Sequence, residues 1–154
     1  MNVFTILTNV AIMTAWSSAI TILSVMALSV VEHKSAAAPV TAISHIFYGD
    51  SAFEARAGDA MHFGIGFVLN VMAMIGWSAV AELVFRALSI DSHRLGYAVL
   101  VAVALSVLAY ITDFHIVPKR FTPGFEHILS KRAIYVTYVF LAISFVIGAM
   151  MRVG

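Results

Sequence analysis

The sequence predicts an all-α membrane protein: a bundle of four transmembrane helices, with a short interfacial or re-entrant helix between the first and second spans. Two observations predict this fold. Hydrophobic residues make up 62% of the 154 residues and charged residues only 11%, whereas a soluble domain has about 45–50% apolar and about 25% charged residues. The apolar residues also lie in four runs, each close to or above the roughly 20 residues that a helix needs to cross a bilayer. Because a soluble chain of this size could not bury so much apolar surface, we expect one integral membrane domain, residues 1–154.

The four predicted spans are separated by two long connections and one short one. The spans run over about residues 3–31, 60–88, 95–117 and 133–151. The first span has no formal charge, and no lysine or arginine precedes Lys34. It therefore lacks the basic start of a cleavable signal peptide, and we interpret it as a retained helix. The short connection, Ser89 to Arg94, predicts a tight antiparallel hairpin between the second and third spans.

Lysine and arginine are divided unequally between the two sides of the predicted bundle. The side of the two long connections has six, namely Lys34, Arg56, Lys119, Arg120, Lys131 and Arg132; the side of the termini has three, namely Arg86, Arg94 and Arg152. Such an excess favours the cytoplasmic side, so we expect the long connections in the cytoplasm and both termini outside. Basic residues at a membrane surface also attract anionic lipids. Lys119, Arg120, Lys131 and Arg132 are predicted to contact lipid headgroups.

The first connection has the features of a short helix. Pro39 suits the first turn of a helix, and Gly49 can end one in the left-handed conformation. On such a helix the apolar side chains would share one face and the polar ones another; the first set is Val40, Ile43 and Phe47, and the second is Thr41, Ser44, His45 and Tyr48. This pattern predicts the interfacial or re-entrant helix. A second short helix, from Glu126 to Arg132, is expected along the headgroups.

Polar side chains within the spans are functional candidates, because charge inside a membrane is costly. Glu82 and Arg86 are four residues apart in the second span, so they share a helix face and can form an ion pair. A role of Glu82 with a substrate or a proton is the alternative. The other polar side chains of the first two spans either hold helices together or line a polar path. They are Asn9, Thr14, Ser17, Ser18, Thr21 and Ser24 in the first span, and Asn70 and Ser78 in the second.

Histidines and carboxylates gather on the side of the two long connections. Because the second and third spans form a hairpin, Asp59 and His62 should lie at the same depth as Asp113 and His115. Imidazole and carboxylate groups are ligands of Zn, Fe and Mn. The sequence therefore predicts a site for a divalent transition metal or haem formed by His45, His62, Asp113 and His115. The alternatives are that each histidine is a hydrogen-bonded interfacial residue, that Asp59 caps the second span, and that Asp113 pairs with Lys119, Arg120 or Arg132.

Several classes of function are excluded or disfavoured. The chain has no cysteine, which excludes a disulfide framework, a thiol relay and an iron–sulfur cluster. The net charge of +1 gives no indication of nucleic-acid binding. No zinc-protease helix, phosphate loop or serine nucleophile elbow is present. Whether the protein is an enzyme stays open. The alternatives to metal binding are a small transporter or channel, in which Glu82, Asn70 and the first-span hydroxyls line a path, and an accessory subunit. In either case a homo-oligomer or a larger membrane complex is a candidate assembly.

Two segments carry a resemblance to other proteins. They are Ala38 to His45 with Gly49-Asp50, and Asp113 to Glu126, which reads DFHIVPKRFTPGFE and is followed by Leu129-Ser130. These motifs resemble a family of small bacterial membrane proteins with about four hydrophobic segments, and the resemblance runs from about Ala36 to Met151. It implies a place in the bacterial cytoplasmic membrane and marks the two long connections as the family signature. Because that family is uncharacterised, it implies no activity, cofactor or catalytic residue.

Overall fold

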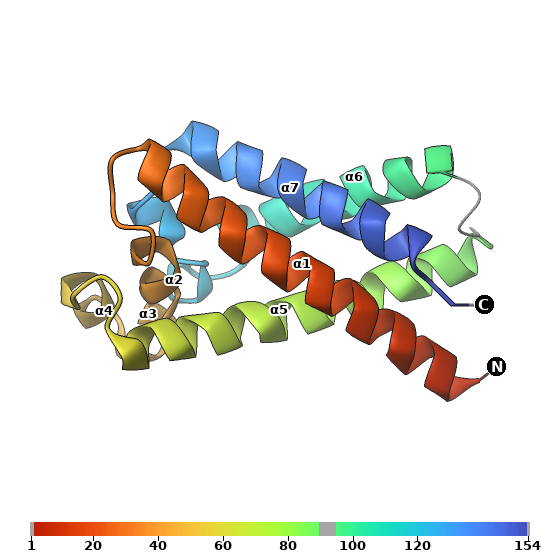
Figure 1. The fold of residues 1–154 in the computed structure, drawn as a ribbon, viewed down its shortest axis with the longest axis horizontal. Helices are drawn as coiled ribbons and strands as arrows, with labels where there is room; N and C mark the ends of the chain where they lie inside the picture. Colours follow the sequence, from red (N-terminus) through yellow and green to blue (C-terminus); the bar gives the residue numbers. More distant parts are fainter. Residues whose placement is uncertain (1, 90–94, 154) are drawn as a thin grey trace.

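The computed structural model describes residues 2–89 and 95–153, and it confirms the all-α fold with a short helix between the first two spans. The four long helices are α1 (Val3–Val31), α5 (Ala60–Ala87), α6 (Leu95–Ile111) and α7 (Lys131–Met150). Figure 1 shows both termini at one end of the bundle and the two long connections at the other. We call these the terminal end and the connection end.

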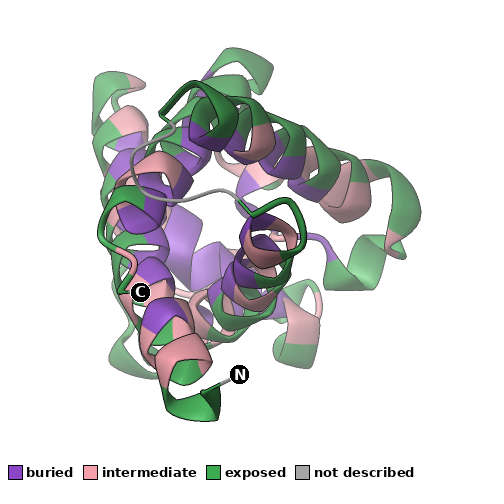
Figure 2. Cartoon of the chain, turned by 90° about the vertical axis from the view of Figure 1, so that its right-hand side faces the viewer, coloured by how far each residue is buried: buried purple, intermediate pink, exposed green. Residues whose placement is uncertain are grey.

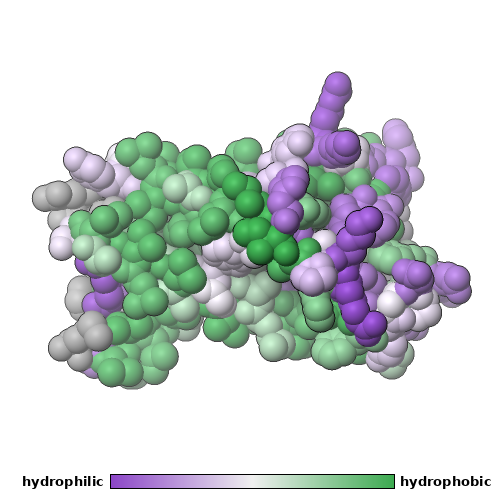
Figure 3. Space-filling view, turned by 180° about the vertical axis from the view of Figure 1, so that it is seen from behind, coloured by the Kyte–Doolittle hydropathy of each residue, from purple (hydrophilic) through white to green (hydrophobic). Residues whose placement is uncertain are grey.

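The four long segments have the length and the composition of membrane spans. Buried residues face the inside of the bundle (Figure 2). Large apolar side chains such as Leu23, Met72 and Leu100 are more than 60% exposed on the outside. The apolar surface covers the length of the bundle between its ends, and long hydrophilic side chains gather at the connection end (Figure 3). The protein is therefore a multi-pass membrane protein.

Polar side chains fix where three of the spans begin. Asn2, Asp59 and Ser130 each accept hydrogen bonds from backbone N–H groups in the first turns of α1, α5 and α7. These N–H groups have no partner inside their helix, so a side-chain cap stabilises the start of the span. The predicted tight turn between the second and third spans falls on residues 90–94, which lie outside the described residues.

The helices do not pack as a uniform bundle. The central helix is α1, which packs against both α7 and α5, while α6 packs against α7. In contrast, α5 makes little contact with α6 and α7. At the connection end α2 (Ala38–Ile43) packs against α5 instead. The divergence of α5 leaves space between the spans, and the long connections fill part of it.

The first connection differs from its prediction in detail. It forms α2, α3 (His45–Tyr48) and α4 (Ser51–Glu54) in place of one helix. The predicted division into an apolar and a polar face is wrong: Thr41 and His45 are buried, whereas Phe47 is 64% exposed. The reason is that α2 is enclosed by α5, α1 and the third connection, so that its polar side is covered as well.

The third connection also differs from its prediction. In place of a helix from Glu126 to Arg132 it has two 3₁₀ turns, η2 (Lys119–Phe121) and η3 (Phe125–His127). Ser130 is extended and caps α7, so the fourth span starts inside the predicted surface helix. Before Pro118, α6 continues as a single π-helical turn, η1 (Thr112–Ile116).

Candidate functional site

A partly enclosed cavity of about 130 Å³ lies among α1, α5, η1 and α7 on the connection side of the bundle. Most of its wall is apolar, with Val25, Ile43, Leu69, Met74, Phe125 and Leu141 among the lining residues. Five lining residues carry polar groups: Thr21, Asn70, Asp113, Thr137 and Tyr138. An apolar cavity with a few converging polar groups is the usual form of a small-molecule site. We therefore take this cavity as the candidate functional site.

Two glycines bring the long connections to the cavity. A Cβ atom at Gly66 of α5 would lie only 1.9 Å from the Val40 carbonyl oxygen. The glycine therefore lets α2 approach α5 closely and places Ile43 in the cavity wall. Gly124 has a φ of 82°, a conformation that glycine adopts without strain. Its turn brings Phe125 to the same cavity.

Asp113 is placed by the π-helical turn η1. Such turns are rare, and they are frequent at functional sites. The Asp113 carboxylate accepts a hydrogen bond from the Tyr138 hydroxyl of α7, with 2.5 Å between the oxygens. Among the described residues no lysine, arginine or histidine side chain forms an ion pair with Asp113. The pairing with Lys119, Arg120 or Arg132 considered above is thus not formed, and the carboxylate lines the cavity without a cationic partner.

Aromatic rings fix the orientation of Tyr138. Its ring lies edge-on to Tyr110, with 5.3 Å between centroids, and 6.0 Å from Phe114. Phe114 in turn contacts Phe125, at 6.1 Å. Because several rings restrict its rotation, the Tyr138 hydroxyl is held toward Asp113. The cavity therefore combines a fixed acceptor with electron-rich ring faces.

A further polar pair of the cavity comes from α1 and α5. The Asn70 amide donates to the Thr21 hydroxyl over 3.5 Å. The Thr21 hydroxyl itself donates to the Ser17 carbonyl of its own helix, at 2.7 Å. This pair lies where α1 and α5 meet, so the cavity extends to the contact between these two spans.

The four predicted metal ligands lie at the connection end, but each has other contacts. His45 has Nδ1 3.0 Å from the Ala42 carbonyl oxygen and Nε2 3.5 Å from that of Lys119, which ties α3 to η2. His62 Nδ1 lies 2.9 Å from Asp59. His115 is exposed and lies edge-on to Tyr110.

Within residues 2–89 and 95–153, no three histidine, aspartate or glutamate side chains come together as a metal site requires. The alternative for Asp59 is confirmed, since its side chain caps α5 by accepting from the N–H groups of Met61 and His62. The hydrogen bond from His62 also lowers the pKa of Asp59 below its usual value. Metal or haem binding by His45, His62, Asp113 and His115 stays a prediction.

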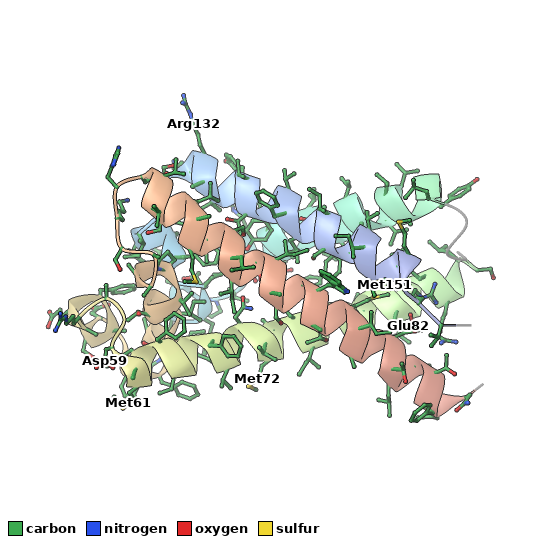
Figure 4. The ribbon with its side chains drawn as sticks, viewed as in Figure 1. Asp59, Met61, Met72, Glu82, Arg132 and Met151 are labelled. Carbon is green, nitrogen blue, oxygen red and sulfur yellow. The ribbon has the colours of Figure 1, made fainter. Side chains whose placement is uncertain are left out.

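A second polar cluster lies at the terminal end, around Glu82 (Figure 4). The predicted ion pair with Arg86 is present, and the Glu82 side chain is fully buried. Two further partners come from distant parts of the chain: Arg152 Nε at 2.7 Å and the Asn9 amide at 3.0 Å. Asn9 also accepts from the backbone N–H of Val153, at 2.9 Å. The cluster therefore holds the C-terminal segment against α1 and α5.

Sequence reasoning placed Asn9 among the polar residues of the first span and Arg152 among the basic residues on the side of the termini, but it did not predict that either contacts Glu82. Asn9 is the one amide side chain within the first span, and a buried amide needs partners, so a contact across helices could have been predicted for it. The four predicted headgroup contacts, Lys119, Arg120, Lys131 and Arg132, are all exposed at the connection end. Figure 4 shows Arg132 pointing away from the bundle there. This position suits headgroup binding, which stays a prediction.

Comparisons of the chain with protein-family models, curated proteins and solved structures find no match. The cavity, in which the Asp113 carboxylate has no cationic partner among the described residues, is thus the feature that bears on function.

Proposed function

We propose that this membrane protein binds a small lipophilic amine in the cavity, with the ammonium group on Asp113 and an apolar body against the walls. The observation that carries the proposal is the Asp113 carboxylate, which lines an apolar cavity without a cationic partner among the described residues. An ionised carboxylate only accepts hydrogen bonds. Tyr138 supplies one donor, and no other residue within 2–89 and 95–153 donates to this carboxylate, which leaves acceptor positions for a ligand.

The chemistry of the wall favours a cation over a neutral group. A hydrogen bond between an ammonium group and a carboxylate is charge-assisted and about twice as strong as a neutral one. Phe121, Phe125 and Tyr138 line the same cavity, and aromatic faces attract a cation within about 6 Å. An anionic ligand would be repelled by Asp113. The site is therefore expected to select its ligand first by positive charge and then by the shape of the apolar body.

The size of the cavity limits the apolar body of the ligand. Its volume is about 130 Å³, and an apolar cavity of about 150 Å³ binds benzene. One aromatic ring or a short aliphatic chain therefore fits. A ligand of this kind dissolves in the membrane, and two lining residues, Ala73 and Phe121, are exposed on the outside of the bundle. We therefore expect the ligand to enter from the lipid, between α5 and the third connection.

Three probes with the same ring test the proposal by calorimetry on the protein in nanodiscs: 2-phenylethylamine, 2-phenylethanol and 3-phenylpropanoate. We expect the amine to bind at least about tenfold more tightly than the alcohol, a difference of about 1.4 kcal/mol. The carboxylate should bind most weakly.

Variants separate charge recognition from general apolar binding. Asp113→Asn should remove the preference for the amine and leave binding of the alcohol nearly unchanged. Asp50→Asn is the matched control, because it makes the same change at an exposed position outside the cavity. Equal affinity for the three probes, or an amine preference that survives Asp113→Asn, would refute the proposal.

A further inference from the structure

Polar side chains of α1 and α5 are hydrogen-bonded to each other at two places, at the cavity and at the terminal end. At the cavity the contact is between Asn70 and Thr21, and at the terminal end it is between Glu82 and Asn9. The two contacts are twelve residues apart on each helix. The two spans are thus antiparallel and in register over this interval, which is about 18 Å long at 1.5 Å per residue.

Along the two helices between these contacts, three hydroxyl groups have no protein partner among the residues that the structure describes. They belong to Thr14 and Ser18 of α1 and to Ser78 of α5, and all three oxygens are buried. Ser78 is fully buried and Ser18 is 6% exposed. Leaving a buried hydroxyl without a hydrogen bond is unfavourable, so three of them on the facing stretches of two neighbouring spans require an explanation.

Adhesion between the two helices is not a sufficient explanation. Serine and threonine hold membrane helices together by bonding across the contact, or they bond to a carbonyl one turn back in their own helix. Elsewhere in the bundle the second arrangement is found, as for Thr137 with Ala133 and Ser144 with Leu141. Thr14, Ser18 and Ser78 form neither kind of bond among the described residues. Water molecules between the spans would satisfy these hydroxyls, since buried water bonds to groups that lack other partners.

We propose that the α1–α5 seam holds a file of water molecules which, together with the cavity on the connection side, conducts protons between the connection end and the terminal end. The seam consists of Asn9, Thr14, Ser18, Thr21, Asn70, Ser78 and Glu82. Each water or hydroxyl accepts a proton from one neighbour and donates a proton to the next, so the step is balanced without a redox partner. Glu82, held by Arg86 and Arg152, is a fixed charge at the end of the file and not a carrier. The proposal does not depend on amine binding.

The absence of native cysteine makes the water in the seam directly testable. Ser78→Cys and Ser18→Cys are reconstituted into liposomes and treated with silver ions, which react with a thiolate that is in contact with water. Val80→Cys is the matched control, because it lies two residues from Ser78 on the opposite, exposed side of α5. Since the thiolate is the reactive form, both seam variants should react at least about tenfold faster than Val80→Cys. A seam cysteine that reacts no faster than the control would overturn the proposal.

Proton conduction is measured separately with a pH-sensitive dye inside proteoliposomes, under a potassium diffusion potential set with valinomycin. We expect proton entry above that of protein-free liposomes. Ser78→Val and Ser18→Val, which replace a hydroxyl with apolar bulk, should each slow it several-fold. Ser144→Val is the control, since Ser144 is equally buried but bonds within α7.

The proton-entry measurements can each support or overturn the proton path. Proton entry equal to that of protein-free liposomes would overturn it, as would entry unchanged in both seam variants. If Ser78→Val does not fold, judged by gel filtration and circular dichroism, Ser18→Val gives the same test. Proton entry without any amine binding would reject the proposed function and keep the proton path.

Discussion

The close approach of α2 to α5 makes Gly66 the most sensitive position in the bundle. A Cβ atom built on Gly66 lies 1.9 Å from the oxygen of Val40 and 3.0 Å from its carbonyl carbon. Ordinary contacts between heavy atoms are about 3.5 Å or longer. The Gly66→Ala variant therefore requires the backbone of α2 to move by more than about 1 Å, a shift that side-chain rotation cannot replace.

Two opposing effects set the size of the change. Overpacking a well-packed interior costs about 1–3 kcal/mol, and we expect a backbone clash at the upper end of that range. Replacing glycine with alanine inside a helix contributes about 1 kcal/mol of stability. The net loss at Gly66 is thus about 1–2 kcal/mol. Gly64, on the same helix, has nothing within 4 Å of its added Cβ, so Gly64→Ala should gain up to about 1 kcal/mol.

The two variants are compared by unfolding in mixed micelles with a rising fraction of a denaturing detergent, followed by circular dichroism. Amine binding is the second readout, because α2 contributes Ile43 to the cavity wall. We expect Gly66→Ala to weaken binding and Gly64→Ala to leave it unchanged. If Gly66→Ala is as stable as Gly64→Ala, the close packing of α2 on α5, and with it the shape of the cavity, is refuted.

Two further predictions concern the ends of the bundle. Glu82→Gln leaves Arg86 and Arg152 beside a neutral group, and removing one member of a buried ion pair costs about 3–5 kcal/mol. The same unfolding assay should show this loss of stability, whereas the exposed control Glu54→Gln should show none. At the connection end, the hydrogen bond from His62 lowers the pKa of Asp59, so Asp59 stabilises the fold above the pKa that it has in the unfolded chain. That contribution is lost as the pH falls through the lowered pKa of the folded state. An NMR titration should place the Asp59 pKa below its usual value of 3.8. In Asp59→Asn the start of α5 should keep its cap, but hydrogen exchange there should depend less on acid. An unshifted Asp59 pKa would contradict the hydrogen bond from His62.

The spans could be predicted from the sequence because a membrane imposes a simple local requirement. A helix in lipid must be continuously apolar and satisfy its own backbone, so hydropathy alone located all four. The start of α5 followed from Asp59, whose capping is also a local property. The Glu82–Arg86 pair was predictable for the same reason, since residues four apart on a helix are neighbours. The contacts of Glu82 with Asn9 and Arg152 depend on the packing of three spans, which no local pattern contains.

The predicted metal site depended on side-chain directions that spacing does not determine. His45 turns to the carbonyl groups of Ala42 and Lys119, because its side chain is buried and a buried imidazole needs partners. Asp113 lies in a π-helical turn, and the wider turn changes the direction of each residue in it. The histidines and carboxylates were thus expected at the correct end of the bundle, but their actual partners depend on the tertiary structure.

The two proposals meet at one place, because Thr21 and Asn70 belong both to the cavity wall and to the α1–α5 seam. A proton that travels along the seam arrives in the cavity that Asp113 lines. One carboxylate can hold a proton or an ammonium ion, but not both, since each neutralises the same charge. Amine binding and proton arrival would then compete for Asp113, and the arrival of a proton would release the amine. The proposed amine site and the proposed proton path are thus coupled through the charge of Asp113. The coupling is specific to this carboxylate, because Asp113 is the acidic residue among those that line the cavity.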